Sequence, residues 1–297
     1  AFHAGKRLKV VDADSMALLY ELPYVGRNES KTTRFTPIWS GDKLYALAYS
    51  SVVTDQRVYQ ANFDTSVAEE TEAVGYGEFG APLADGRLAL GGFSFSPEIV
   101  DPQSGETTEL AAESGGLYSF TTAPSGDLVT GGRQGDVRHW SSKTGQLVRT
   151  FRGLNKTLVT ALSVSPDGKY LVAGDNHGNT ICWKMDSGEP VGKLGGGSSR
   201  DIGVSLLAFQ GNESFFQGRS GGLALYSLSG EKLKSWSMGA STIAVDPARQ
   251  RLATGQGEVG EVSLSNKRES VLLQGFGSEA TALLYDSSNL IVGTSAG

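Results

Sequence analysis

Residues 158–194 read LVTALSVSPDGKYLVAGDNHGNTICWKMDSGEPVGKL, and this stretch decides the fold. Its short β-rich runs are separated by turn-forming groups such as Pro166-Asp167-Gly168 and Ser187-Gly188. Residues 117–151, LYSFTTAPSGDLVTGGRQGDVRHWSSKTGQLVRTF, align with it turn for turn. Both copies place glycine at the end of the second run and tryptophan at the end of the third. The sequence therefore contains a repeat with four short strands in each copy.

Weaker copies of the repeat continue in the same phase along the chain. The residue at the end of the second run recurs every 37 to 44 residues, at Ala48, Gly91, Gly131, Gly174, Gly218, Gly255 and Gly293. A period of this length with four strands per unit is typical of a β-propeller blade. We therefore predict one all-β domain over residues 1–297, a seven-bladed β-propeller.

The two ends of the chain are predicted to share one blade. The last copy stops at Gly297 after two strands, and residues 6–22 read as two further strands. Pairing strands from both ends would close the ring and leave no open sheet edge there. The alternative is a fragment whose missing strands lie outside this sequence. Numbered from the closing blade, the predicted blades are residues 1–22 with 278–297, 32–74, 75–112, 113–152, 153–195, 196–238 and 239–275.

Two residue types are expected to let neighbouring blades pack closely. Glycine at the end of the second strand, as at Gly174, allows backbones to approach near a crowded axis. Trp140 and Trp183 end the third strand of their repeats, where a large ring can fill the space between blades.

The composition agrees with a turn-rich β protein. Glycine supplies 40 of 297 residues, which argues against a helical bundle, and apolar residues (39%) suffice for a core. The net charge of −6 gives no general attraction to nucleic acid or anionic membranes. The single cysteine, Cys182, allows neither an intrachain disulfide nor a cysteine-rich zinc site, and we expect it to be a small core residue.

The two clearest copies resemble the repeats of the WD40 propellers, on the segments 122–145 and 163–188. The resemblance implies a scaffold that binds other proteins. The family often has Gly-His before the first strand and Trp-Asp after the third, and neither pair is present here. The aspartate that the family places in the turn before the third strand falls on Gln134 and His177. We therefore expect the buried Asp-His-Ser-Trp network of the family to be absent or rebuilt.

Residues for catalysis or metal binding are sparse. The three histidines, His3, His139 and His177, form no metal-ligand spacing, and the Gly-rich segment 195–200 lacks the lysine and helix of a phosphate-binding loop. We expect no catalytic residue, no metal and no cofactor. The alternative is a propeller enzyme, or a small-ligand or metal binder, that uses the central channel, as a hydrolase or lactonase would.

Charge is distributed unevenly along the chain. Residues 55–113 hold twelve acids and two arginines, whereas residues 133–156 hold six basic residues and one aspartate. We interpret the basic segment of blade four as a docking face, because complementary charge steers encounter and fixes orientation; a solvated rim is the alternative. The candidate partner contacts are Arg133, Arg138, His139, Arg149 and Arg152 on this face, and Asp175, Asn176, His177, Arg219 and Gln256 around one mouth of the ring.

We therefore predict a non-catalytic protein-interaction scaffold, a monomeric propeller within a larger hetero-complex. Its partners are expected to be other proteins, without nucleic acid and without membrane insertion. We expect a cytoplasmic location, with a periplasmic or secreted one as the alternative. The chain begins at Ala1 without methionine, which fits either processing or a cut from a longer sequence.

Overall fold

The protein consists of β-strands joined by turns. The computed structural model describes residues 2–4, 7–11, 18–25, 34–40, 42–49, 57–75, 77, 79–93, 95–110, 116–154, 156–195, 203–219, 222–236, 242–246, 251–256, 258–263, 270–273, 280–286 and 289–294. All 29 regular elements in these ranges are strands, and the described residues contain no helix.

Six units of four antiparallel strands make up most of the molecule, and each runs as a simple meander. We call the strands of a unit A to D in chain order. Blade two has β4 (Arg34–Ser40), β5 (Lys43–Tyr49), β6 (Arg57–Asn62) and β7 (Val67–Val74), and blade three has β8 (Phe79–Pro82), β9 (Leu88–Gly92), β10 (Phe95–Val100) and β11 (Thr107–Glu109). Blade four has β12 (Leu117–Thr122), β13 (Leu128–Gly132), β14 (Val137–Trp140) and β15 (Leu147–Phe151). Blade five has β16 (Val159–Val164), β17 (Tyr170–Asp175), β18 (Thr180–Lys184) and β19 (Pro190–Leu194). Blade six has β20 (Leu206–Gln210), β21 (Ser214–Arg219), β22 (Gly222–Ser227) and β23 (Lys232–Trp236), and blade seven has β24 (Thr242–Asp246), β25 (Arg251–Gln256), β26 (Glu258–Ser263) and β27 (Ser270–Leu273).

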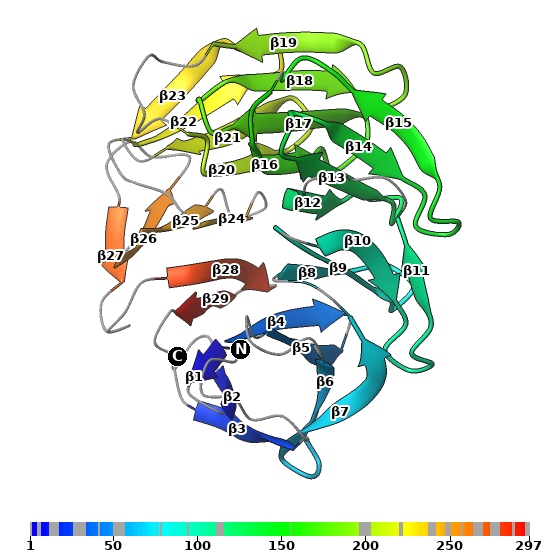
Figure 1. The fold of residues 1–297 in the computed structure, drawn as a ribbon. Helices are drawn as coiled ribbons and strands as arrows, with labels where there is room; N and C mark the ends of the chain where they lie inside the picture. The colour runs from blue at the N-terminus through cyan, green and yellow to red at the C-terminus, as the bar shows by residue number, and fades with distance from the viewer. Residues whose placement is uncertain are drawn as a thin grey trace.

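The units are arranged around a ring (Figure 1). The A strands of consecutive units lie next to one another, as β12 does to β16, β16 to β20 and β24 to β28 (Ala280–Asp286). The fold is therefore a β-propeller, as the repeat predicts. The count of seven complete blades and the residue ranges given for them stay predictions.

The prediction that strands from both chain ends pair in one sheet is not met in the described residues. β28 and β29 (Asn289–Thr294) form a two-stranded sheet, and the N-terminal part supplies three strands, β1 (Phe2–Ala4), β2 (Arg7–Val11) and β3 (Leu18–Val25). β1 contacts both β29 and β4, so the two ends of the chain meet in the ring (Figure 1). β3 adds to blade two instead, in a parallel ladder on the outer strand β7. The extra strand, β1, pairs antiparallel with β2, with Ala4 opposite Arg7.

Apolar clusters lie between consecutive blades from two to seven. Trp140 is buried with Leu83 and Ile99 of blade three, and Trp183 with Val129 and Phe151 of blade four. The prediction that both tryptophans fill the space between blades is confirmed. Because blades three to six bury both faces against their neighbours, stability is shared between adjacent blades.

Glycine at the end of strand B marks the closest approach between blades. A Cβ atom built on Gly174 would lie 2.6 Å from Cβ of Val204, and one on Gly131 would lie 2.6 Å from Cγ1 of Val159. Val159 begins strand A of the next blade, and Val204 lies just before the next strand A. A side chain at either glycine would therefore push the following blade away.

Replacing Gly174 with Ala tests this close packing. The added methyl group must displace Val204, and overpacking of this kind costs about 1–3 kcal/mol of unfolding free energy. Urea unfolding followed by circular dichroism measures the loss. Gly195→Ala is the matched control, because a Cβ atom there meets nothing within 4 Å. Equal stability of the two variants would show that the approach at Gly174 is not tight.

Candidate interaction surface

The meander places two sets of turns on opposite faces of the ring. The turns between strands B and C lie on the same face as the connections from one blade to the next, and we call this the B–C face. The turns between strands A and B, and between C and D, lie on the other face, which we call the A–B face. Loops on a rigid frame of this kind commonly carry binding residues.

Three exposed basic side chains lie at the B–C end of blade four. Arg133 is in the turn between β13 and β14, Arg152 follows β15, and Lys156 is in the connection to blade five. The backbone N–H of Lys156 donates to the carbonyl oxygen of Gln134 at 3.0 Å, which holds the connection against the turn. We call Arg133, Arg152 and Lys156 the basic cluster. Lys156 is one of the six basic residues of segment 133–156, but it was not predicted as a partner contact.

Arg138 lies on strand β14 below the basic cluster and is half-buried. Its Nη2 atom is 3.8 Å from Oδ2 of Asp136, the one acidic residue of the segment 133–156. Arg138 therefore presents less free charge to a partner than the sequence suggests.

Arg149 and His139 lie apart from the basic cluster. Arg149 donates from Nη1 to the carbonyl oxygen of Ser187 at 2.8 Å and from Nη2 to that of Asp186 at 2.6 Å. These bonds join blade four to the turn between β18 and β19, on the A–B face of blade five. His139 is paired through Nε2 with Oδ2 of Asp127 at 3.2 Å, and its Nδ1 atom is buried without a hydrogen-bond partner in the described structure. The five residues predicted as one basic face are thus not brought together.

Asp175 organises the neighbouring B–C turn. Its side chain is fully buried, and Oδ1 accepts from the backbone N–H of His177 at 2.9 Å and of Asn179 at 2.8 Å. Oδ2 accepts from Nδ2 of Asn179 at 2.8 Å. The carboxylate therefore holds the turn from inside and is not available to a partner.

Two more predicted contacts belong to the same frame. Oδ1 of Asn176 accepts from the backbone N–H of Leu158 at 3.0 Å, which ties the turn to strand A of its own blade. Arg219 of blade six donates from Nη2 to the carbonyl oxygen of Gly178 at 2.7 Å. His177 is exposed at the tip of the turn. Gln256 ends β25, and its side chain lies outside the described residues.

The buried polar network expected from the resemblance is rebuilt rather than absent. In blade four, the indole N–H of Trp140 donates to Oγ1 of Thr130 at 2.9 Å, with both residues buried. In blade five, the indole N–H of Trp183 donates to the backbone carbonyl oxygen of Arg152 at 3.1 Å. The carboxylate that caps this turn belongs to Asp175. The family pattern placed it two positions later, where this chain has His177.

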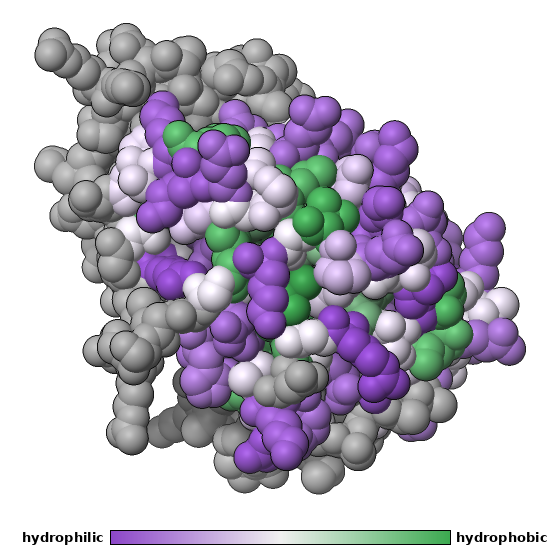
Figure 2. All heavy atoms as spheres, turned by 90° about the horizontal axis from the view of Figure 1, so that it is seen from above, coloured by the Kyte–Doolittle hydropathy of each residue, from purple (hydrophilic) through white to green (hydrophobic). Residues whose placement is uncertain are grey.

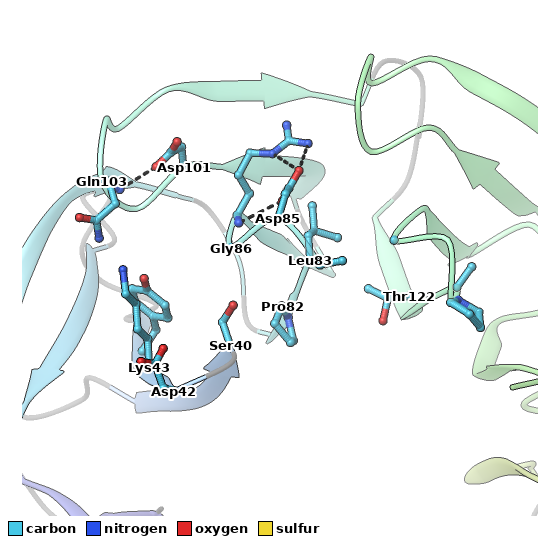
Figure 3. A pocket seen from close by; sticks show the side chains of 16 residues that line it. Ser40, Asp42, Lys43, Pro82, Leu83, Asp85, Gly86, Asp101, Gln103 and Thr122 are labelled. Atoms are coloured by element: carbon cyan, nitrogen blue, oxygen red, sulfur yellow. Dashed lines mark hydrogen bonds and ion pairs between the residues drawn. The ribbon is translucent and has the colours of Figure 1, made fainter.

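A polar cavity of about 590 Å³ lies on the A–B face between the turns of blades two, three and four (Figure 3). Asp85 and Arg87 form an ion pair at 2.7 Å at its edge, and this hydrogen bond from Arg87 holds the pKa of Asp85 below its ordinary value. The backbone N–H groups of Gln103 and Ser104 lower the pKa of Asp101 in the same way. A second cavity of about 600 Å³ adjoins it, lined by acidic side chains that include Asp64, Glu69, Glu70 and Glu72. The acidic segment 55–113 therefore surrounds a hollow on this face.

Neither a cluster of metal ligands nor a membrane-spanning helix occurs in the described part of the chain. No group of three or more His, Cys, Asp or Glu side chains there is arranged to hold a metal ion. No helix there is long and apolar enough to span a membrane.

Sequence comparison identifies the repeat. Residues 145–184 match the family model "WD domain, G-beta repeat", which covers the end of blade four and most of blade five. The nuclear distribution protein nudF of Emericella nidulans is 31% identical over 75 residues, 25% of this chain and 17% of nudF. These matches support a divergent, WD40-like repeat in this chain. Protein tipD of Dictyostelium discoideum is 29% identical over 114 residues, 35% of this chain and 18% of tipD.

The chain thus spans less than one fifth of the length of either curated relative. Structural comparison extends the likeness of the fold to the whole chain. The crystal structure of the computationally designed Ika8 protein superposes with a TM-score of 0.76 at 18% identity, over 100% of this chain and 90% of that one.

Replacing Asp175 with Ala tests the rebuilt network. The variant leaves the N–H groups of His177 and Asn179 without their acceptor, and we expect a loss of about 2–3 kcal/mol in unfolding free energy. Urea unfolding measures it. His177→Ala, which removes the exposed side chain from the same turn, should stay within about 0.5 kcal/mol of the wild type. A similar loss in both variants would mean that the turn depends on its tip and not on the buried carboxylate.

Cys182 is expected to resist alkylation in the folded protein. The thiol is buried in β18, and burial raises its pKa from 9.0 to about 12. Because the folded pKa exceeds the unfolded one, the stability linked to this thiol is complete below about pH 9 and declines as pH rises toward 12. Iodoacetamide labelling followed by mass spectrometry, near neutral pH and with or without urea, measures reactivity. Equal labelling of the folded and unfolded chains would contradict the burial.

Proposed function

We propose that this WD40 propeller is a non-catalytic interaction scaffold, one subunit or domain of a larger assembly, that binds a partner protein through the B–C face of blade four. WD40-repeat proteins in general serve as scaffolds for protein interaction, and the family match and the two relatives support that general role. The observation that carries the finer proposal is the basic cluster, which is exposed, while nearby polar residues are engaged in the frame.

The division between frame and surface selects the residues for the test. Arg149 makes two bonds to blade five, so reversing its charge would disturb the contact between blades as well as a docking surface. Arg133 and Lys156 are exposed, and within the described residues no hydrogen bond or ion pair joins their side chains to the frame. Changes at these two positions therefore report on binding without weakening the ring.

The variant Arg133→Glu/Lys156→Glu should lose partner capture. Charge reversal at the rim of an interface slows encounter, and we expect roughly tenfold less partner in affinity capture from the source cells, quantified by mass spectrometry. Raising the salt concentration should reduce capture by the wild type in the same direction. The midpoint of thermal unfolding should stay unchanged.

The control carries the same change in net charge at another place. Lys193→Glu/Lys232→Glu alters two exposed lysines on the outer strands of blades five and six. This variant should capture partners as the wild type does. If the two variants behave alike, the B–C face of blade four is not the docking surface.

A further inference from the structure

The outer strand of each propeller blade leaves a row of backbone N–H and C=O groups unpaired by its own sheet. Such edges invite pairing with another chain, and proteins usually guard them by covering them, shortening them or placing proline or lysine on them. In this molecule the outer strand of blade two is covered, because β3 pairs with β7 through Tyr24 with Ala68 and Val25 with Glu69. The chain itself therefore shows that a blade edge here accepts an added strand.

Three other outer strands carry recognisable guards. β11 of blade three is only three residues long. β19 of blade five begins with Pro190, which has no N–H to donate. β23 of blade six carries Lys232 and Lys234 on either side of its exposed leucine, Leu233. The side chains of β27 in blade seven lie outside the described residues.

Strand β15 of blade four lacks these guards. It is five residues long, it ends the order of its sheet, and no described strand pairs with its outer edge. Leu147 and Val148 are 48% and 53% exposed, and they are among the large apolar side chains most open to water. The only charge within the strand, Arg149, is directed at the carbonyl oxygens of blade five. Figure 2 shows the molecule from above the view of Figure 1, where small apolar patches lie among mostly polar side chains.

The charges around β15 indicate what the edge would accept. Residues 137–166 contain no Asp or Glu, and two exposed cations flank the strand, Lys143 in the turn before it and Arg152 directly after it. A second copy of this chain paired edge to edge would bring two such sets of cations together, which is unfavourable. A strand with acidic side chains would instead face opposite charge at both ends.

We propose that the outer edge of β15 accepts an extended segment of a partner protein, with alternating apolar and acidic residues, as a fifth strand of blade four. The apolar residues cover Leu147 and Val148, the acidic ones face Lys143 and Arg152, and the backbone groups of β15 pair with the added strand. This inference rests on the proposed scaffold function and names the chemistry of a partner on the same blade, at the rim instead of the B–C face.

A short peptide that alternates valine and glutamate is the probe, with its valine–lysine counterpart as the charge control. We expect the valine–glutamate peptide to bind the full chain in calorimetric titration and to slow amide hydrogen exchange at residues 147–151. Leu147→Ser/Val148→Ser should weaken binding about tenfold or more, because it removes the apolar contact. Leu233→Ser, an equally exposed leucine on the outer strand of blade six, should bind like the wild type.

Several outcomes would overturn the proposal. These are binding without protection of β15, equal binding of the valine–lysine peptide, or a double serine variant that binds normally. A dimer of the free chain that Leu147→Ser/Val148→Ser dissociates would assign the edge to a second copy instead. Folding of each variant is checked by its unfolding midpoint, which two half-exposed positions should leave nearly unchanged.

The peptide experiment also separates the two proposals. Arg133→Glu/Lys156→Glu leaves β15 and its flanking cations in place, so it should bind the valine–glutamate peptide. Normal capture of cellular partners by that variant would contradict partner binding at the B–C face. Loss of peptide binding in the serine variant would still support strand addition at the outer edge of β15.

Discussion

The close packing of each blade against the next is the constraint on which the rest of the structure depends. A four-stranded meander has two faces and cannot bury either one alone. The apolar clusters between blades bury both, and Gly131 and Gly174 permit the approach because a side chain there would meet a valine of the next blade. Most polar groups near these interfaces then have a partner inside the protein, because a buried polar group without one costs free energy; Nδ1 of His139 is an exception.

This requirement explains why so many polar residues of blades four to six belong to the frame. Asp175 satisfies the N–H groups of a tight turn, and Arg149 and Arg219 donate to backbone carbonyl oxygens of neighbouring blades. These charged groups form hydrogen bonds with the backbone at strand ends, where the backbone N–H and C=O groups have no partner in a sheet. A charged residue at a turn of this propeller can therefore either stabilise the contact between blades or bind a partner. Only its hydrogen bonds and ion pairs distinguish the two roles.

The sequence carried the repeat, the strand order and the packing role of Trp140 and Trp183, because these depend on local period and residue size. It did not separate Arg149 from Arg133, since both look like exposed cations when only their neighbours in the chain are known. The acceptors of Arg149 lie 37 and 38 residues away, in another blade. Asp175 was missed as a turn cap for a related reason, because the family pattern placed the carboxylate two positions later.

Closing a ring of blades does not remove the edges of its sheets. The interior strands pair with neighbours in the same sheet, but each blade keeps one outer strand. The sequence of that strand determines whether its free edge is protected from pairing with another chain. β7 is covered by β3, and β11, β19 and β23 are short or carry proline or lysine. An outer strand that keeps two apolar side chains in water and has cations at both ends is exposed at a cost in solubility and free energy. The exposure of such a strand is explained if a partner covers it. The rim of blade four is therefore as informative about function as the turns on the B–C face.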